Sequence, residues 1–183
     1  MLTKTISIEK ARSIKGWMTD VELSFLAERA QDAKIIFEIG SYEGRSARAL
    51  ADNSSDDTKI YCIDPWDAPI FWTNNDMFVT NESTFGMFQC NMYDHLKTRK
   101  VIPITKRYND WTPIGMADFI FIDGDHSYEY IKHDILKSLQ YLKTGGILAG
   151  HDNNWPGVEK AINELLTDYP VKNEETIWWT KKF

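Results

Sequence analysis

Residues 118–128 have the sequence DFIFIDGDHSY, in which a short apolar run passes into a polar turn. The run is rich in isoleucine and phenylalanine, which is typical of a buried strand. Two more runs of this kind cover residues 34–39 and 59–63, and residues 146–149 form a fourth candidate. Each run leads on its C-terminal side into Gly, Asp or His, so polar groups are predicted at the carboxyl ends of the strands.

Segments with helical spacing lie between these runs, at residues 20–31, 44–51, 128–142 and 157–166. Strands that alternate with helices predict a parallel sheet, and continuously apolar strands predict helices on both of its faces. With right-handed crossovers few topologies remain, and a doubly wound α/β domain is expected. Residues 169–183 form two short extended pieces around residues 173–175, which predicts a C-terminal antiparallel hairpin at the sheet edge.

The length and composition predict one ordinary globular domain over residues 1–183. The net charge of −6 argues against nucleic acid as a partner, because phosphate backbones are bound by basic surfaces. No apolar run is long enough for a signal peptide or a membrane span, so a cytoplasmic protein with no membrane partner is expected. The oligomeric state is left open.

Residues 66–95 have no clear period and are rich in Trp, Phe, Met and Asn. A connection of this length is unusual in a compact domain. We expect either a lid or substrate-binding insertion, with Trp66, Phe71, Trp72 and Phe78 among the covering residues, or a surface helix and loop that cover the core.

The first two strand ends suggest a nucleoside ligand. Residues 38–46 contain Gly40 and Gly44 directly before a helix, and such a turn lets the backbone approach a ligand closely. Asp64 follows the second strand about 20 residues later, where a carboxylate can accept hydrogen bonds from both hydroxyls of a ribose. The alternative is that Asp64 caps the next turn.

The other two strand ends carry acids and imidazoles. Asp123 and His126 follow one strand, and His151, Asp152 and Asn153 follow the other. Because carboxyl ends of parallel strands share one edge, the oxygen ligands among these residues suit a hard cation. Separate capping and turn roles for the acids are the alternative.

The chain resembles the class I methyltransferases grouped as methyltransferase domain 24, over residues 16–19, 37–46, 63–66, 118–128 and 145–152. The resemblance implies a Rossmann-like fold that binds S-adenosylmethionine (SAM). It implies that the methionine and ribose side of SAM is lined by Gly40, Ser41 and Gly44. It further implies that Asp64 binds the ribose hydroxyls and that Glu38 anchors the loop. Tyr108, which follows the strand-like residues 101–105, falls where related enzymes contact adenine.

A second likeness concerns the metal: Asp123, Asp152 and Asn153 match the magnesium ligands of catechol O-methyltransferase. His126 falls where that enzyme has a lysine base, so His126 or His151 would take the acceptor proton. These likenesses imply a SAM-dependent O-methyltransferase, assisted by a divalent metal, that acts on a small polyol, sugar or phenol. The alternatives are a metal-independent methyltransferase, in which Asp123 contacts the cofactor directly, and a non-catalytic SAM-binding module.

Overall fold

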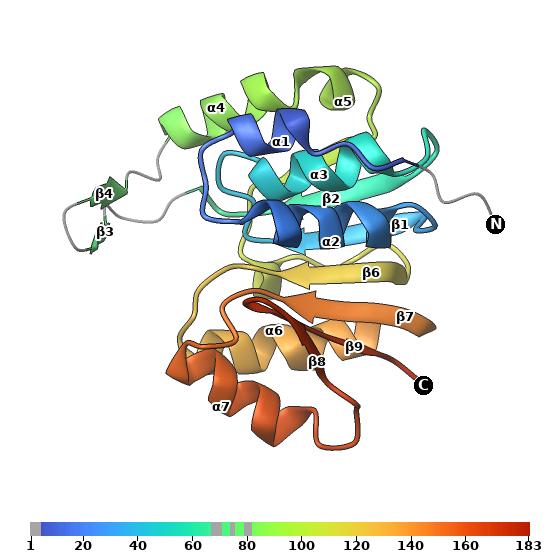
Figure 1. Cartoon of the computed structure of the whole chain (residues 1–183), viewed down its shortest axis with the longest axis vertical. Helices are drawn as coiled ribbons and strands as arrows, with labels where there is room; N and C mark the ends of the chain where they lie inside the picture. The colour runs from blue at the N-terminus through green and yellow to red at the C-terminus, as the bar shows by residue number, and fades with distance from the viewer. Residues whose placement is uncertain (1–4, 67–70, 74–75, 79–81) are drawn as a thin grey trace.

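The computed structural model describes residues 5–66, 71–73, 76–78 and 82–183. Its centre is a seven-stranded sheet with the strand order β5-β2-β1-β6-β7-β9-β8 (Figure 1). The first five strands in this order are parallel: β5 (Val101–Ile104), β2 (Lys59–Ile63), β1 (Ile35–Ile39), β6 (Ala117–Ile122) and β7 (Leu142–Gly150). The predicted parallel α/β sheet is confirmed.

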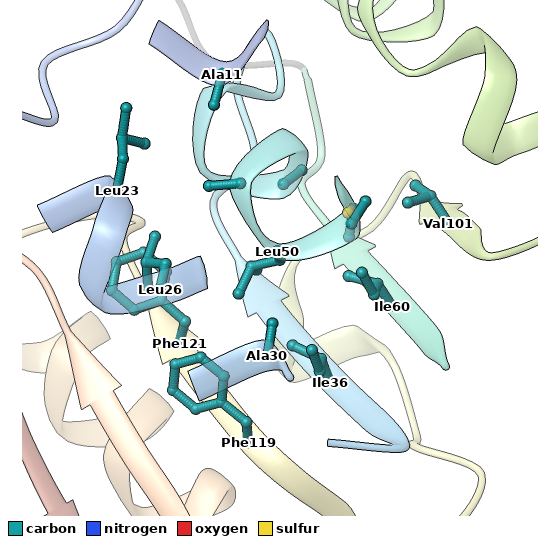
Figure 2. Close-up of a cluster of buried hydrophobic side chains, with 14 of the residues drawn as sticks. Ala11, Leu23, Leu26, Ala30, Ile36, Leu50, Ile60, Val101, Phe119 and Phe121 are labelled. Carbon is teal, nitrogen blue, oxygen red and sulfur yellow. The ribbon is translucent and has the colours of Figure 1, made fainter. Parts of the chain in front are cut away.

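Helices cover both faces of the sheet, as the apolar strands predicted. One face packs against α1 (Glu9–Ser13), α2 (Asp20–Ala30), α3 (Arg45–Asn53) and α4 (Glu82–Asn91). The other packs against α6 (Tyr128–Tyr141) and α7 (Pro156–Leu165). Successive strand residues alternate between the two cores, since Ile36 belongs to the first and Phe37 to the second. Figure 2 shows Leu26 and Leu50 from two helices gathered with Ile36 and Phe121 from two strands.

The predicted C-terminal hairpin is also confirmed. β9 (Ile177–Lys181) pairs antiparallel with β7, and β8 (Lys172–Glu174) pairs antiparallel with β9 at the sheet edge. Trp178 is fully buried beside Gly150, where any larger residue would collide with its indole ring. This contact fixes β9 against the strand that leads into His151.

Residues 66–95 combine a short strand pair with helices. β3 (Phe71–Thr73) pairs antiparallel with β4 (Asp76–Phe78), and α4 is followed by α5 (Tyr93–Lys97). Phe88 and Met92 are fully buried in the core that contains α3, and Trp66 packs on Phe85 and Phe88 at 4.7 and 5.0 Å between ring centroids. Part of this region is therefore a structural cover. The side chains of Phe71, Trp72 and Phe78 lie outside the described part of the chain.

Within the described ranges, none of the helices combines the length and the apolar composition that a membrane span requires.

Candidate active site

Four polar strand ends lie in one row at the carboxyl edge of the sheet. The residues directly after β1, β2, β6 and β7 are Gly40, Asp64, Asp123 and His151. Each donates its backbone N–H to the end of a neighbouring strand, at 2.9, 3.1, 2.7 and 2.9 Å respectively. These bonds continue the parallel ladder and set the four residues level with one another. Strand order reverses here, with β2 on one side of β1 and β6 on the other, which is where open α/β sheets bind ligands.

The turn after β1 is held by the carboxylate of Asp64. Its Oδ2 accepts hydrogen bonds from the backbone N–H groups of Ser41 and Tyr42, both at 3.0 Å, and its Oδ1 accepts one from Trp66 at 2.7 Å. Tyr42 and Trp66 both have left-handed backbone conformations, with φ of 46° and 48°, which bulky residues rarely adopt. The capping contact that the sequence left open is therefore present, and it stabilises two strained turns.

Gly40 is required by a close approach between two strand ends. Its φ is 85°, and a Cβ atom there would lie 2.1 Å from the carbonyl oxygen of Asp123. Gly44, with a φ of 91°, begins α3 and faces Phe88 and Met92 of the helical cover. Gly40 and Ser41 line the cavity described below, whereas Gly44 is not among its described lining residues.

Glu38 is buried beneath the same turn. Its Oε2 accepts a 2.5 Å hydrogen bond from the Ser41 hydroxyl, and Ser46 and Cys62 are further hydrogen-bond partners of its carboxyl group. Burial raises the pKa of Glu38 to about 7. The predicted anchoring of the loop matches this position behind Ser41, and Glu38 does not itself line the cavity among the described residues.

Arg45 fastens the N-terminal segment across the turn. Its guanidinium group donates to the carbonyl oxygens of Arg12, Ile14 and Met18, at 2.8, 2.7 and 2.7 Å. The loop between α1 and α2, which includes Trp17, consequently forms one wall of the cavity.

His151 is the centre of a buried charge cluster and is only 7% exposed. Its Nδ1 lies 3.1 Å from Asp152 Oδ2 and 3.5 Å from Asp123 Oδ1, and its Nε2 lies 3.2 Å from Glu22 Oε1 and 3.0 Å from the Thr176 hydroxyl. Burial lowers the pKa of His151, but hydrogen bonds to the three carboxylates outweigh it and raise the pKa to about 12. His151 is therefore charged near neutral pH and has no free site for a further proton.

His126 lies on the cavity side of this cluster. Its Nε2 is 2.7 Å from Asp152 Oδ2, and its ring stacks on Trp155 with centroids 4.8 Å apart. Burial lowers the pKa of His126, but the ion pair with Asp152 raises it by more, so the net shift is upward. Donor atoms of Asp123, His126 and Asp152 all lie within 4.8 Å of one another, which is a spacing that can hold a cation.

Asn153 points away from these carboxylates. Its side-chain amide donates to the carbonyl oxygen of Glu175 at 3.1 Å, and its backbone N–H donates to Thr176 at 3.0 Å. It lines a separate, smaller cavity beside α7. The third donor beside Asp123 and Asp152 is thus His126.

One cavity of about 1100 Å³ joins these features. Gly40, Ser41 and Asp64 line one part of it, and Asp123, His126, His151 and Asp152 line another. Tyr108, in the short 3-10 helix η1 (Tyr108–Asp110), lines a third part together with Asp134 of α6.

A family model described as a methyltransferase domain matches residues 37–153, which contain all of these strand ends. The chain belongs to this methyltransferase domain family.

The methyltransferase also resembles solved structures and one curated protein. A SAM-dependent O-methyltransferase from Thermotoga maritima superposes with a TM-score of 0.68 at 15% identity, over 96% of this chain and 70% of that one. An O-methyltransferase from Bacillus cereus in complex with SAH superposes with a TM-score of 0.67 at 17% identity, over 96% of this chain and 87% of that one. At such identities the likeness is one of fold. A protein of unassigned function from Acanthamoeba polyphaga mimivirus is 28% identical over 139 residues, and this chain spans 72% of its own length and 58% of that relative.

Several residues that shape the site of this methyltransferase domain were not predicted from the sequence: Glu22, Arg45, Asp134, Trp155 and Thr176. The sequence did give a signal for one wall of the cavity, because Gly16, Trp17 and Met18 belong to the family resemblance and line the cavity. Glu22 follows Thr19 at capping-box spacing, which explains its helix cap but gives no indication of its contact with His151.

Proposed function

We propose that this methyltransferase transfers the methyl group of SAM to the hydroxyl oxygen of a small acceptor. The observation that carries the proposal is that one cavity joins the glycine turn and Asp64 to the His126–Asp152 pair. The first part suits a nucleoside cofactor, and the second suits a hydroxyl that must lose its proton. Mere binding of SAM would not require the second part.

In this proposal SAM lies along the row of strand ends. Gly40 and Ser41 face its methionine and ribose portions, and Asp123 faces the cofactor from the neighbouring strand. Asp64 accepts the ribose hydroxyls with the same carboxylate that holds the turn through backbone hydrogen bonds from Ser41, Tyr42 and Trp66. Glu38 and Gly44 support the turn from behind.

His126 is the proposed proton acceptor. The acceptor oxygen attacks the methyl carbon of SAM, the bond from sulfur to that carbon breaks, and the acceptor proton passes to the imidazole of His126. Asp152 orients that imidazole through the 2.7 Å contact between its Oδ2 and His126 Nε2, and it stabilises the charge that the imidazole gains. His151, already protonated, compensates Asp123 and Asp152, so its proposed role is to hold the two carboxylates in position.

A divalent cation is the second candidate, because the donor atoms of Asp123, His126 and Asp152 cluster closely. Asp123 and Asp152 would hold magnesium, which commonly takes one or two carboxylates and keeps several waters. A bound cation supplies Lewis-acid chemistry that lowers the pKa of a coordinated hydroxyl. Asn153 would have to release Glu175 to join them, so His126 is the nearer third donor.

The acceptor is proposed to be a small hydroxylated ring compound such as a sugar or phenol. Exposed aromatic rings border the cavity: Trp155 is 48% exposed beside His126, and Trp17 is 61% exposed and lies 5.4 Å from Tyr42. Such rings stack on the flat faces of small acceptors. The net charge of −6 argues against a nucleic-acid acceptor.

Calorimetry and turnover test the proposal. SAH should bind in the micromolar range, and a panel of hydroxylated small molecules should reveal methyl transfer from SAM. Preferential binding of a nicotinamide dinucleotide would contradict the cofactor, and SAH binding without turnover on any acceptor would favour a binding module. Methyl transfer that stops in chelator and returns with magnesium would select the cation account, and full activity in chelator would select His126 as base. Asp152→Ala should lose most turnover in either account while it still binds SAH.

A further inference from the structure

An unpaired acid lies in the cavity away from the site described above. Asp134 is on the buried face of α6 and is only 5% exposed. It lines the cavity, yet its carboxyl group makes no hydrogen bond or ion pair within the described ranges. A buried carboxyl group without a partner is unfavourable, and groups of this kind in native proteins usually have a purpose.

Two buried hydroxyls lie near Asp134. They belong to Tyr108 and Ser138, and Ser138 acts on the Tyr108 hydroxyl as a hydrogen-bond partner. Ser138 is one helical turn after Asp134, and the charge of Asp134 acts on the Tyr108 hydroxyl. The nearby Lys137 does not satisfy Asp134, because its ammonium group donates to the carbonyl oxygens of Tyr108 and Trp111. Asp134 therefore presents to the cavity a buried carboxyl group that a bound molecule can satisfy.

Asp134 is separate from the charge cluster around His151. The charged groups that act on Asp134 are Lys137 and Asp125, whereas those that act on Asp123 are His151, Asp152 and His126. The two sets share no residue, and Asp125 lies in the loop between Asp123 and His126.

The position of Asp134 fits the base of a nucleoside. Asp64 follows β2, and η1 follows the adjacent strand β5, so a nucleoside held by its ribose at Asp64 extends its base toward Tyr108. α6 contacts η1 here, which brings Asp134 to the same end of the cavity. The amino group of adenine is a hydrogen-bond donor, and a carboxyl oxygen is an acceptor whether or not the group is ionised.

We propose that Asp134 accepts a hydrogen bond from the 6-amino group of the SAM adenine and makes the site selective for adenine over purines without that group. The inference rests on the proposed SAM binding and adds a specificity residue to it. A site built to bond a ligand group discriminates strongly against an analogue that lacks it, because the buried acceptor is then left unpaired.

Calorimetry with two ligands isolates this contact. The ligands are SAH and its analogue in which hydrogen replaces the 6-amino group. Wild-type protein should bind SAH about tenfold more tightly than the analogue. Asp134→Leu should bind both equally, whereas Asp134→Asn, which keeps an acceptor oxygen, should keep the preference. Asp110→Leu, at an exposed acid of η1, is the matched control and should behave as wild type.

Several outcomes would overturn the inference. If wild type binds both ligands equally, Asp134 does not recognise the amino group. If Asp134→Leu weakens both ligands alike and retains the tenfold preference, its role is to shape the cavity. Should Asp134→Leu fail to fold, the same comparison is made with Asp134→Ala, with circular dichroism as the check of folding. Folded wild-type protein that binds neither ligand contradicts the proposed function itself, and this inference with it.

Discussion

Buried polar groups have hydrogen-bond or charge partners along the row of strand ends, whereas Asp134, at the end of the cavity beside α6, lacks them among the described residues. Along the row, Asp64 accepts three backbone hydrogen bonds, and His151 compensates the carboxylates around it. At the α6 end, the buried carboxyl group of Asp134 makes no hydrogen bond or ion pair within the described ranges. Satisfied networks rigidify a site before the ligand arrives, whereas unsatisfied groups gain their partners from the ligand.

This contrast assigns stability and recognition to different places. Removing a satisfied group should damage both the fold and the site, because its partners are left unpaired in a region of low dielectric. Removing an unsatisfied group should leave the folded protein as stable or more stable and should affect only the ligand. Four predictions test this division, from the largest expected effect to the smallest.

His126→Ala should lower turnover by about 10²–10⁴-fold, because a positioned proton acceptor contributes about that much. SAH affinity should stay close to that of wild type, since Asp64 and the glycine turn are untouched. His133→Ala, at an exposed histidine of α6, is the control and should leave both quantities unchanged. Steady-state kinetics with SAM and calorimetry with SAH measure them. Turnover at the wild-type level would remove His126 from the mechanism.

His151→Ala should lower the free energy of unfolding by about 3–5 kcal/mol, the usual effect of removing one partner from a buried ion pair. The carboxylates of Glu22, Asp123 and Asp152 would then lack the positively charged imidazole that all three contact. Urea denaturation measures the change. Thr176→Val gives a graded comparison, since it removes only the hydroxyl between His151 and Glu22 and should cost about 1 kcal/mol. Equal, small effects of both substitutions would show that His151 is not the centre of the cluster.

Asp64→Ala should weaken SAH binding by about 1–3 kcal/mol and lower the unfolding free energy by about 1–2 kcal/mol. Both changes follow from one side chain, because the carboxylate that faces the ligand also holds the backbone of Ser41, Tyr42 and Trp66. Asp32→Ala, at an exposed acid before β1, is the control. Weaker binding without a loss of stability would mean that the turn keeps its shape without Asp64.

Asp134 should make the stability of the protein depend on pH. Burial raises its pKa from the usual 3.8 to about 7, with Lys137 lowering it and Asp125 raising it to smaller extents. Between these values the folded state holds a proton that the unfolded state has lost, so the unfolding free energy falls as pH rises. From pH 5.5 to 6.5, wild type should lose about 1 kcal/mol more than Asp134→Asn. Glu38 titrates in both proteins and cancels in the difference. Urea denaturation at the two pH values measures this difference. If wild type and Asp134→Asn lose the same unfolding free energy between them, the unpaired state of Asp134 is contradicted.

The sequence by itself determined the architecture of this methyltransferase domain. The strands β1, β2 and β6, the helices α2, α3, α6 and α7 and the edge hairpin were all predicted, because hydrophobic periodicity and capping are local properties. β7 is longer than the predicted 146–149, since Leu142 directly follows α6 and already pairs with Ala117. The row of polar strand ends followed as well, because carboxyl ends of parallel strands share one edge.

Tertiary structure alone decided how these polar groups are paired. Glu22 and His151 are 129 residues apart in sequence, and only the docking of α2 beside the hairpin turn at Thr176 brings their side chains together. The pKa of His151, and with it the choice of His126 as the proposed base, depends on that contact. The turn of Asn153 toward Glu175, the position of Glu38 behind Ser41 and the unpaired state of Asp134 are likewise set by neighbours distant in sequence. Backbone periodicity is encoded residue by residue, whereas the charge state of a buried group depends on every element packed around it.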